Sequence, residues 1–166
     1  MYLTIWRHGE AGDATRDRLR ELTERGQQDI RRGWPKFARF CEQRGIALPD
    51  AILYSEWVRT RQTAAILSSQ LPNAHSAACT ALLPGRRPAD VDTELELICR
   101  AEPRAHLLLV SHQPLVSALV DHYVGEKNRV PALMPGAFAT LDIDVLAQGC
   151  GAPRFCAQPP SYESIT

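Results

Sequence analysis

A run of large aliphatic residues in the second half of the chain constrains the fold more than any other feature. The stretch HLLLVSH at 106–112 places four consecutive aliphatic residues between two histidines. Such an unbroken run is typical of a parallel strand that is buried on both faces. A parallel strand of this kind needs helices to cover it on each side, so the remaining sequence should supply them.

Strand-like and helix-like patterns alternate along the chain. We expect strands at 1–6, 51–55, 78–83, 106–112, 136–145 and 153–158. We expect helices at 23–41, 55–71, 88–101 and 114–125. This alternation predicts an α/β fold: a single-domain three-layer sandwich with a mostly parallel central sheet and helices on both faces. The last two strands should form an antiparallel edge hairpin, and 136–145 alternates as a half-exposed strand does.

Individual residues predict where the helices begin and end. Thr23 and Ser55 can each cap the start of a helix with a side-chain oxygen. Pro35 should kink the first helix or split it in two, because proline removes a backbone hydrogen bond. Pro114 suits the first turn of the last helix, and Gly125 suits its end.

Composition indicates one soluble domain without strong surface charge. The chain has 166 residues, for which we expect a single domain at 1–158 and a C-terminal tail at 159–166. Lysines plus arginines equal aspartates plus glutamates, at 19 each, so net charge does not favour nucleic acid or a membrane surface. The five cysteines include no CxxC pair, which disfavours a disulfide framework. With no secretory signal or membrane span in the sequence, we expect a cytoplasmic protein.

Three of the expected strands end in residues that can bind an anion. The strand at 1–6 leads into Arg7 and His8, the strand at 51–55 is followed after one turn by Arg59, and the 106–112 strand ends in His112. Ligands of open α/β sheets bind beyond the carboxyl ends of the strands. If these strands are parallel neighbours, two arginines and two histidines converge. Two guanidinium groups together favour a phosphate dianion.

Four segments resemble one enzyme family in the same order. They are RHGE at 7–10, LTERG at 22–26, SEWVRTRQTA at 55–64 and VSHQPLV at 110–116. Together they resemble the histidine phosphatase superfamily, which has the phosphoglycerate-mutase-like fold. The short length and the spacing within the last two segments are most similar to the small bacterial phosphohistidine phosphatases of the SixA branch. The matching segments span most of the chain.

The resemblance implies catalytic roles for four residues. His8 would attack phosphorus and form a covalent phosphohistidine, which water then hydrolyses. Arg7 and Arg59 would hold the equatorial oxygens, whose charge must be stabilised in the transition state. His112 would be a third donor, as an imidazolium beside the dianion.

The resemblance also implies that Gly9 and Arg20 bind substrate. It implies that the enzyme uses no metal or other cofactor. Gly9 would let the backbone approach the ligand, whereas Arg20 could equally belong to a solvated ion-pair surface. A zinc site built from His8, Glu10 and His112 is an alternative. It leaves the two neighbouring arginines unexplained, because their charges would repel a cation.

The chain lacks an acid where many superfamily members have one. These members use a Glu or Asp after the third strand as general acid, yet no carboxylate occurs from Trp57 through Ala89. A sugar alkoxide needs a proton to leave, whereas the imidazole of a phosphohistidine can carry its own. The sequence therefore favours phosphohistidine as substrate, with Glu10, Asp90 and Asp92 as candidates for a displaced acid.

The resemblance also implies the partners. A phosphatase of this branch would act in signal transduction on a phosphohistidine-bearing protein, such as a histidine-phosphotransfer domain or a phosphotransferase-system carrier, and would release phosphate. Two alternatives are a small-molecule phosphomonoesterase and a non-catalytic module that binds phosphohistidine. His8 disfavours the module, because binding needs only the cations.

Overall fold

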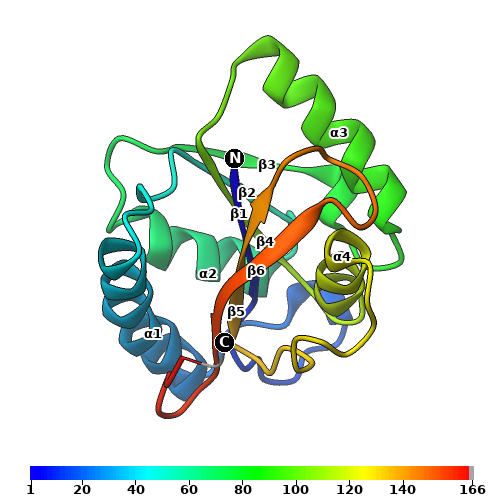
Figure 1. Ribbon diagram of the computed structural model, residues 1–166. Coiled ribbons are helices and arrows are strands. Elements are labelled where there is room, and N and C mark those ends of the chain that lie inside the picture. The colour runs from blue at the N-terminus through cyan, green and yellow to red at the C-terminus, as the bar shows by residue number, and fades with distance from the viewer. Residues whose placement is uncertain (165–166) are drawn as a thin grey trace.

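The computed structural model describes residues 1–164 and contains one mixed sheet between two pairs of helices (Figure 1). The strands are β1 (Tyr2–Arg7), β2 (Ala51–Tyr54), β3 (His75–Ala78), β4 (His106–Ser111), β5 (Phe138–Ile143) and β6 (Gly151–Ala157). The helices are α1 (Glu24–Gln43), α2 (Val58–Ser68), α3 (Pro88–Ala101) and α4 (Leu115–Val124). Two short 3-10 helices are η1 (Asp17–Leu19) and η2 (Thr80–Leu82). The predicted α/β fold class is confirmed.

The sheet order brings the three strand ends together. The strands lie in the order β3-β2-β4-β1-β5-β6. The first four are mutually parallel, and β5 and β6 run antiparallel at the other edge, as expected. In the register of β1 with β4, Arg7 is opposite Ser111. The carboxyl ends of β2, β4 and β1 are therefore adjacent.

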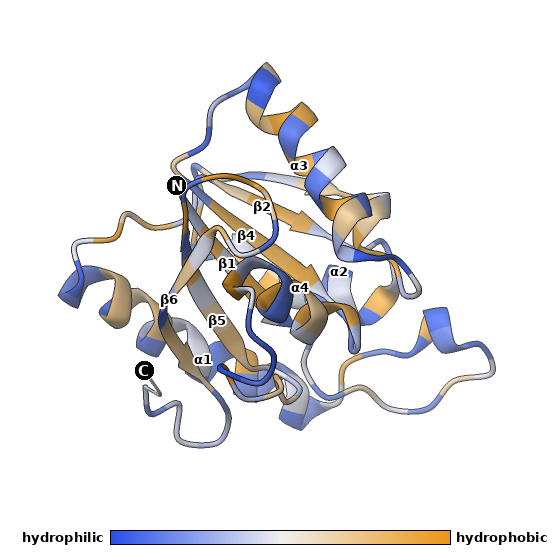
Figure 2. Cartoon of the chain, turned by 45° about the vertical axis from the view of Figure 1, so that its right-hand side comes forward, coloured by the Kyte–Doolittle hydropathy of each residue, from blue (hydrophilic) through white to orange (hydrophobic). Residues whose placement is uncertain are grey.

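Helices cover both faces of the sheet because side chains alternate along the strands. On β1, Leu3 and Ile5 point into the apolar cluster under α3 and α4. Trp6 points to the opposite face, where its ring packs 5.6 Å from that of Phe37 on α1. In Figure 2 the inner strands are largely hydrophobic, whereas α3 has one hydrophobic and one hydrophilic side. This arrangement holds the carboxyl ends of the parallel strands in a rigid frame.

The predicted split at Pro35 does not occur. Helix α1 continues without a break from Glu24 to Gln43, with Pro35 inside it. Trp34 and Phe37 are buried on either side of the proline, while Pro35 itself is exposed. Burial of this apolar face outweighs the hydrogen bond that the proline removes.

Two predicted boundaries near the middle of the chain are wrong. Ser55 does not cap α2; Trp57 is its N-cap, and Ser55 remains in the loop between β2 and α2. The strand expected at 78–83 lies earlier, at β3, and residues 80–82 form η2 instead. The sequence pattern misplaces this strand because β3 is an edge strand with mostly exposed residues, which carry little periodic signal.

The prediction of a half-exposed strand near the C-terminus is also wrong. In β5 every residue except Asp142 is buried. Its two neighbours, β1 and β6, hold it inside the sheet, and side chains of both apolar clusters cover its faces. Polar Thr140 fits there because its hydroxyl lies 2.8 Å from that of Thr4 on β1. A buried polar residue whose hydroxyl is hydrogen-bonded to a neighbouring strand thus gives the sequence the alternating polar and apolar pattern of a half-exposed strand.

Part of the stretch expected to be a tail packs into the fold. Tyr162 is 1% exposed, and its hydroxyl lies 2.8 Å from the carbonyl oxygen of Asp29 and 3.1 Å from that of Gly136. A Cβ atom at Gly33 would lie 2.8 Å from the Tyr162 ring, so this glycine makes the contact possible. Residues 165–166 of the expected tail lie outside the described residues.

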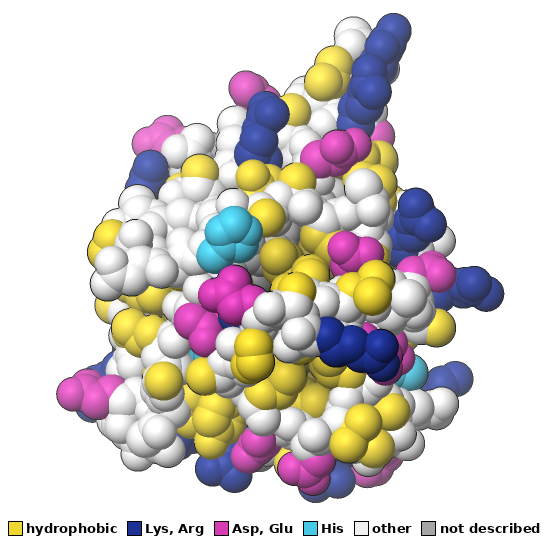
Figure 3. Space-filling model, turned by 90° about the horizontal axis from the view of Figure 1, so that it is seen from above, with side chains coloured by type: hydrophobic (Ala, Val, Ile, Leu, Met, Phe, Trp, Pro, Cys, Tyr) yellow, Lys and Arg dark blue, Asp and Glu magenta, His cyan; other side chains and the backbone are white. Residues whose placement is uncertain are grey.

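The surface around the start of β1 carries no single-sign charge patch. Figure 3 views the molecule from this side, and positive and negative side chains are interspersed there among hydrophobic and uncharged ones. Among residues 1–164, no helix has both the length and the apolar character needed to cross a membrane.

Candidate active site

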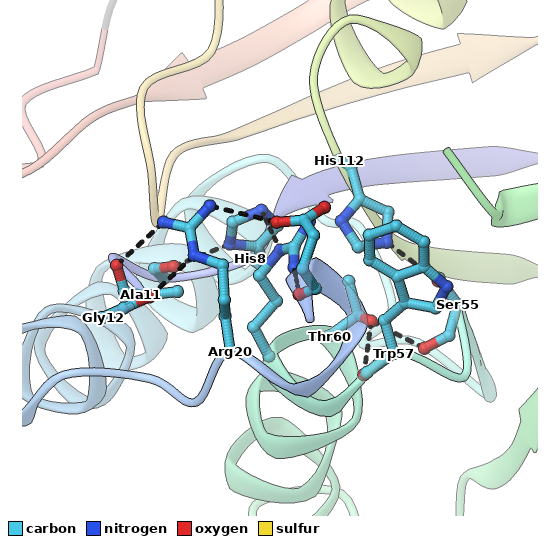
Figure 4. Close-up of polar contacts among 11 residues, drawn as sticks. His8, Ala11, Gly12, Arg20, Ser55, Trp57, Thr60 and His112 are labelled. Carbon is cyan, nitrogen blue, oxygen red and sulfur yellow. Dashed lines mark hydrogen bonds and ion pairs between the residues drawn. The ribbon is translucent and has the colours of Figure 1, made fainter. Parts of the chain in front are cut away.

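A pocket of about 300 Å³ lies at the carboxyl ends of β1, β2 and β4. The five side chains that the sequence singles out for phosphate chemistry all line it, and Asp17 joins them. These residues are Arg7, His8, Asp17, Arg20, Arg59 and His112. The parallel pairing of three strands thus converts residues far apart in sequence into one cationic site (Figure 4).

His8 is held as a neutral imidazole with one ring nitrogen directed to the pocket. Its Nδ1 lies 2.7 Å from the carbonyl oxygen of Gly9, which can only accept, so Nδ1 carries the hydrogen. Burial lowers the pKa of His8 to about 4; the Gly9 hydrogen bond opposes this, while the charges of Arg59 and Arg7 reinforce it. At neutral pH, Nε2 is therefore unprotonated, as a nucleophile requires.

Arg59 lies against this nitrogen. Its Nε–H donates to Nε2 of His8 at 3.1 Å, and its guanidinium carbon lies 4.8 Å from the centre of the Trp57 ring. The residue stands in the first turn of α2, and the hydroxyl of Thr60 fixes that turn by donating to the carbonyl of Ser55 at 2.7 Å. Arg59 is 5% exposed, so its position is set by packing as well as by charge.

Arg7 retains a donor for a ligand. Its Nη1 donates to the carbonyl oxygen of Leu133 at 2.9 Å. Its Nε is buried and has no partner in the described part of the chain. A buried donor without an acceptor destabilises the protein. An oxyanion that accepts from this N–H would therefore gain more binding free energy than one that accepts from a donor already hydrogen-bonded to water.

His112 completes the opposite wall of the pocket. Its ring centre lies 5.1 Å from that of His8, and its Nε2 lies 2.8 Å from the hydroxyl oxygen of Ser55. Its Nδ1 is buried without a partner among residues 1–164. Burial, with the charges of His8 and Arg59, lowers the pKa of His112 to about 3. The protein by itself thus holds His112 neutral, and the imidazolium expected from the sequence would need a dianion to stabilise it.

Arg20 reaches the pocket from the loop before α1. Its Nε donates to the carbonyl of Gly12 at 2.7 Å, and its Nη2 donates to that of Ala11 at 3.1 Å (Figure 4). Its Nη1 lies 3.2 Å from Oδ1 of Asp17. Arg20 thus lines the pocket and also forms a partly exposed ion pair, in which 36% of its side chain and 55% of that of Asp17 are accessible.

Gly9 serves a contact that the sequence did not predict. A Cβ atom there would lie 2.8 Å from the carbonyl oxygen of Gly26 in α1. Its N–H donates to the hydroxyl of Thr63 on α2 at 3.2 Å, and its carbonyl orients His8. In this structure, the absence of a side chain at Gly9 therefore allows helix α1 to pack closely against the loop after β1.

The candidate acids separate into two groups. Asp90 caps the start of α3, and Asp92 accepts from the hydroxyl of Tyr123 at 2.7 Å; neither lines the pocket. Glu10 does line it, but its Oε1 accepts from the hydroxyl of Thr23 at 2.9 Å. No group of three or more His, Cys, Asp or Glu side chains within residues 1–164 could hold a metal ion, so the zinc alternative lacks a ligand set there.

Sequence reasoning missed Asp17, Ser55 and Trp57 as parts of the site. Asp17 stands three residues before Arg20, a spacing at which opposite charges pair on a helical turn, so this signal was present. Ser55 and Trp57 carried no comparable signal, because their contacts with His112 and Arg59 exist only after the strands pair.

Comparisons with known proteins identify the fold. No protein-family model matches the chain, and no curated protein does either. Among solved structures, the protein histidine phosphatase SixA complexed with tungstate is 28% identical, with a TM-score of 0.78 over 96% of this chain and 97% of that one. A protein from Agrobacterium tumefaciens assigned as a phosphohistidine phosphatase SixA is 24% identical, with a TM-score of 0.74 over 95% and 98% of the two chains. An Escherichia coli protein assigned as an alpha-ribazole-5'-P phosphatase is 17% identical, with a TM-score of 0.64 over 92% and 94%.

Proposed function

Because this chain has the fold of the histidine phosphatase superfamily in its SixA-like form, we propose that it hydrolyses phosphohistidine through a covalent phospho-His8 intermediate. The likeness to solved phosphatases supports phosphatase activity of the kind found in this superfamily, without specifying the substrate. One observation carries the proposal. Nδ1 of His8 donates to Gly9, so a neutral Nε2 faces a pocket lined by three arginines.

The first step transfers the phosphoryl group to the enzyme. The phosphoryl oxygens bind between Arg7, Arg59 and His112, where Nε of Arg7 and Nδ1 of His112 are buried without a partner among the described residues. The electron pair on Nε2 of His8 then forms a bond to phosphorus. The bond from phosphorus to the substrate imidazole breaks, and its electron pair stays on that imidazole. Arg59 must first release Nε2, to which it donates in the structure.

The second step returns the enzyme to its starting state. A water oxygen attacks phosphorus from the side that the leaving imidazole vacated. The bond between phosphorus and Nε2 breaks, and its electron pair returns to His8. One proton of the water passes to a phosphoryl oxygen, and inorganic phosphate leaves the pocket as dihydrogen phosphate. The arginines stabilise the charge of the phosphoryl oxygens in both transition states.

The state of the nearby carboxylates supports phosphohistidine over phosphate esters. Glu10 is hydrogen-bonded to Thr23, and Asp17 is paired with Arg20 and Arg59. Partial burial tends to raise the pKa of Asp17, but its hydrogen bond from Arg20 and the charge of Arg59 hold that pKa below its ordinary value. An ionised Asp17 is a poor general acid. An imidazole leaving group does not need one, since it can depart with its own proton.

The expected partner is a phosphohistidine on the surface of a signalling protein. A histidine-phosphotransfer domain or a phosphotransferase-system carrier presents such a group, and a cytoplasmic location would bring them together.

A side-by-side assay tests the proposal. The purified protein is given a phosphorylated histidine-phosphotransfer domain, a phosphorylated phosphotransferase-system carrier, phosphoramidate and a panel of phosphate monoesters. We expect the highest kcat/KM on one of the phosphohistidine proteins and much lower values on sugar phosphates. A sugar phosphate that is hydrolysed faster than both proteins would instead identify a small-molecule phosphomonoesterase. Binding without turnover of any substrate would identify a phosphohistidine-binding module.

A further inference from the structure

Asp17 bridges two of the three arginines in the pocket. Its Oδ1 lies 3.2 Å from Nη1 of Arg20, and its Oδ2 lies 3.3 Å from Nη2 of Arg59. Its backbone carbonyl accepts from Nη1 of Arg59 at 2.7 Å. Two carboxylate oxygens between two guanidinium groups reproduce the contacts that two phosphoryl oxygens would make.

These contacts occupy the arginines. Each of the three nitrogens of the Arg59 guanidinium has an acceptor, namely Nε2 of His8 or an oxygen of Asp17. The same is true of Arg20, whose acceptors are two backbone carbonyls and Asp17. An oxyanion that pairs with Arg59 competes with Asp17 for the same positive charge and the same terminal nitrogens, and displacement of the Asp17 side chain would also free Arg59 to move away from the nucleophile.

The two partners of this ion pair are unequally anchored. The side chain of Arg59 is 6% exposed, whereas that of Asp17 is 55% exposed. Arg59 stands on α2 against the Trp57 ring, whereas Asp17 stands on the 3-10 helix η1, which buries none of its residues. When the pair separates, Asp17 is the partner that can turn into solvent.

We propose that Asp17 determines the specificity of the site as a built-in competitor, which a phosphoryl dianion displaces and a monoanion does not. This inference rests on the proposed function, because it concerns the same pocket. A monoanion such as acetate would only exchange one carboxylate for another, so its binding would gain little free energy from the displacement of Asp17. A phosphoryl dianion carries more charge and a third oxygen. It could also accept from Nε of Arg7 and, in the tautomer that carries its hydrogen on Nδ1, from His112; both nitrogens are buried without a partner among the described residues.

The test measures oxyanion affinity in two variants with the same change in charge. Asp17→Asn removes the competing charge, and Asp13→Asn removes a charge from an exposed residue of the same loop that has no ion pair among the described residues. Tungstate and inorganic phosphate are titrated calorimetrically into the wild type and both variants. We expect Asp17→Asn to bind each anion about threefold to tenfold more tightly, with a lower KM for an aryl phosphate. Asp13→Asn should match the wild type.

Acetate provides the second measurement. In Asp17→Asn, added acetate should occupy the vacated position and return the tungstate affinity toward the wild-type value. In the wild type, the same acetate concentration should change little.

Three outcomes decide the question. Weaker or unchanged tungstate binding in Asp17→Asn would overturn the inference, since a residue that only positions Arg59 cannot improve affinity when it is removed. Equal tightening in Asp13→Asn would also overturn it, because the effect would then come from net charge alone. If no form of the protein bound tungstate or phosphate, the proposed function would fail as well.

Discussion

The hydroxyl oxygen of Ser55 lies 2.8 Å from Nε2 of His112, and both side chains are almost completely buried. If the hydroxyl donates to Nε2, the hydrogen of the neutral imidazole must be on Nδ1, the nitrogen without a partner. Ser55 would thereby give His112 the tautomer that can donate to a phosphoryl oxygen.

We expect Ser55→Ala to lower kcat by about tenfold to hundredfold with a smaller change in KM, because the tautomer is then no longer fixed. Nitrogen NMR of the His112 ring should report a mixture of tautomers in the variant. Ser68→Ala, at the end of α2 and outside the pocket, is the matched control. Unchanged kinetics in Ser55→Ala would show that His112 does not depend on this hydroxyl.

His8→Asn should abolish turnover while part of the oxyanion binding remains. The amide cannot form the covalent intermediate, but Arg7, Arg59 and His112 still supply donors to the anion. Steady-state kinetics and tungstate titration measure the two effects separately. Labelled substrate should mark His8 and no other residue in the wild type. The same substitution at exposed His75 should leave both measurements unchanged, and a His8→Asn enzyme that kept most of its rate would rule out this nucleophile.

Removal of metal ions should not change the rate. The proposed mechanism stabilises the phosphoryl charge with guanidinium groups and His112, and it includes no step at a metal. The rate is measured before and after dialysis against EDTA. Loss of activity that a divalent ion restores would contradict the mechanism and revive the zinc alternative.

The rate should rise as the pKa of the leaving group falls. Oε1 of Glu10 accepts from Thr23, and Asp17 is paired with Arg59, so we expect neither residue to protonate a poor leaving group efficiently. General acid catalysis is worth about 10²–10⁴-fold, and we expect aryl phosphates and phosphoramidate to exceed glycerol phosphate by a factor in this range. Glu10→Gln should alter the rate on phosphohistidine only mildly. A loss of a hundredfold or more, confined to poor leaving groups, would identify Glu10 as the acid.

Stability should fall as the pH is lowered from about 6.5 toward 4. His106 is fully buried between Thr4 and the carbonyl of Ala47, and burial lowers its pKa to about 4 from an ordinary value of 6.5. Between these values the unfolded chain binds a proton that the folded protein excludes. The free energy of unfolding should therefore fall by about 1.4 kcal/mol per pH unit for this histidine alone. Urea denaturation across this range measures the slope, and a flat profile would mean that His106 is protonated in the fold.

The parts of this protein that follow from local sequence were predictable. The buried run at 106–112 and the residues after each strand predicted the sheet and the positions of Arg7, His8, Arg59 and His112 correctly. Their convergence follows because parallel neighbours bring their carboxyl ends to one edge.

The failures have a common physical cause in contacts between segments distant in sequence. The hydroxyls of Thr4 and Thr140 satisfy each other, so an interior strand looked like a surface one. Tyr162 lies in a short polar segment near the C-terminus. Its ring is buried because Gly33 has no side chain to block it, and the sequence around Tyr162 does not reveal this contact. The spacing of Asp17 and Arg20 gave a local signal, but the contact of Asp17 with Arg59 depends on α2, which follows about forty residues later.

The position of β1 has a consequence for the order in which the protein can fold during synthesis. This strand leaves the ribosome before its two neighbours, β4 and β5, which are translated roughly a hundred residues later or more. The nascent chain therefore carries an unpaired apolar strand, with His8 directly after it, until β4 and β5 have been translated. Such long-range pairing favours slow folding and exposes the chain to misassociation. No truncated product that stops before β4 can contain an assembled site, because β4 joins β1 to β2 and leads into His112.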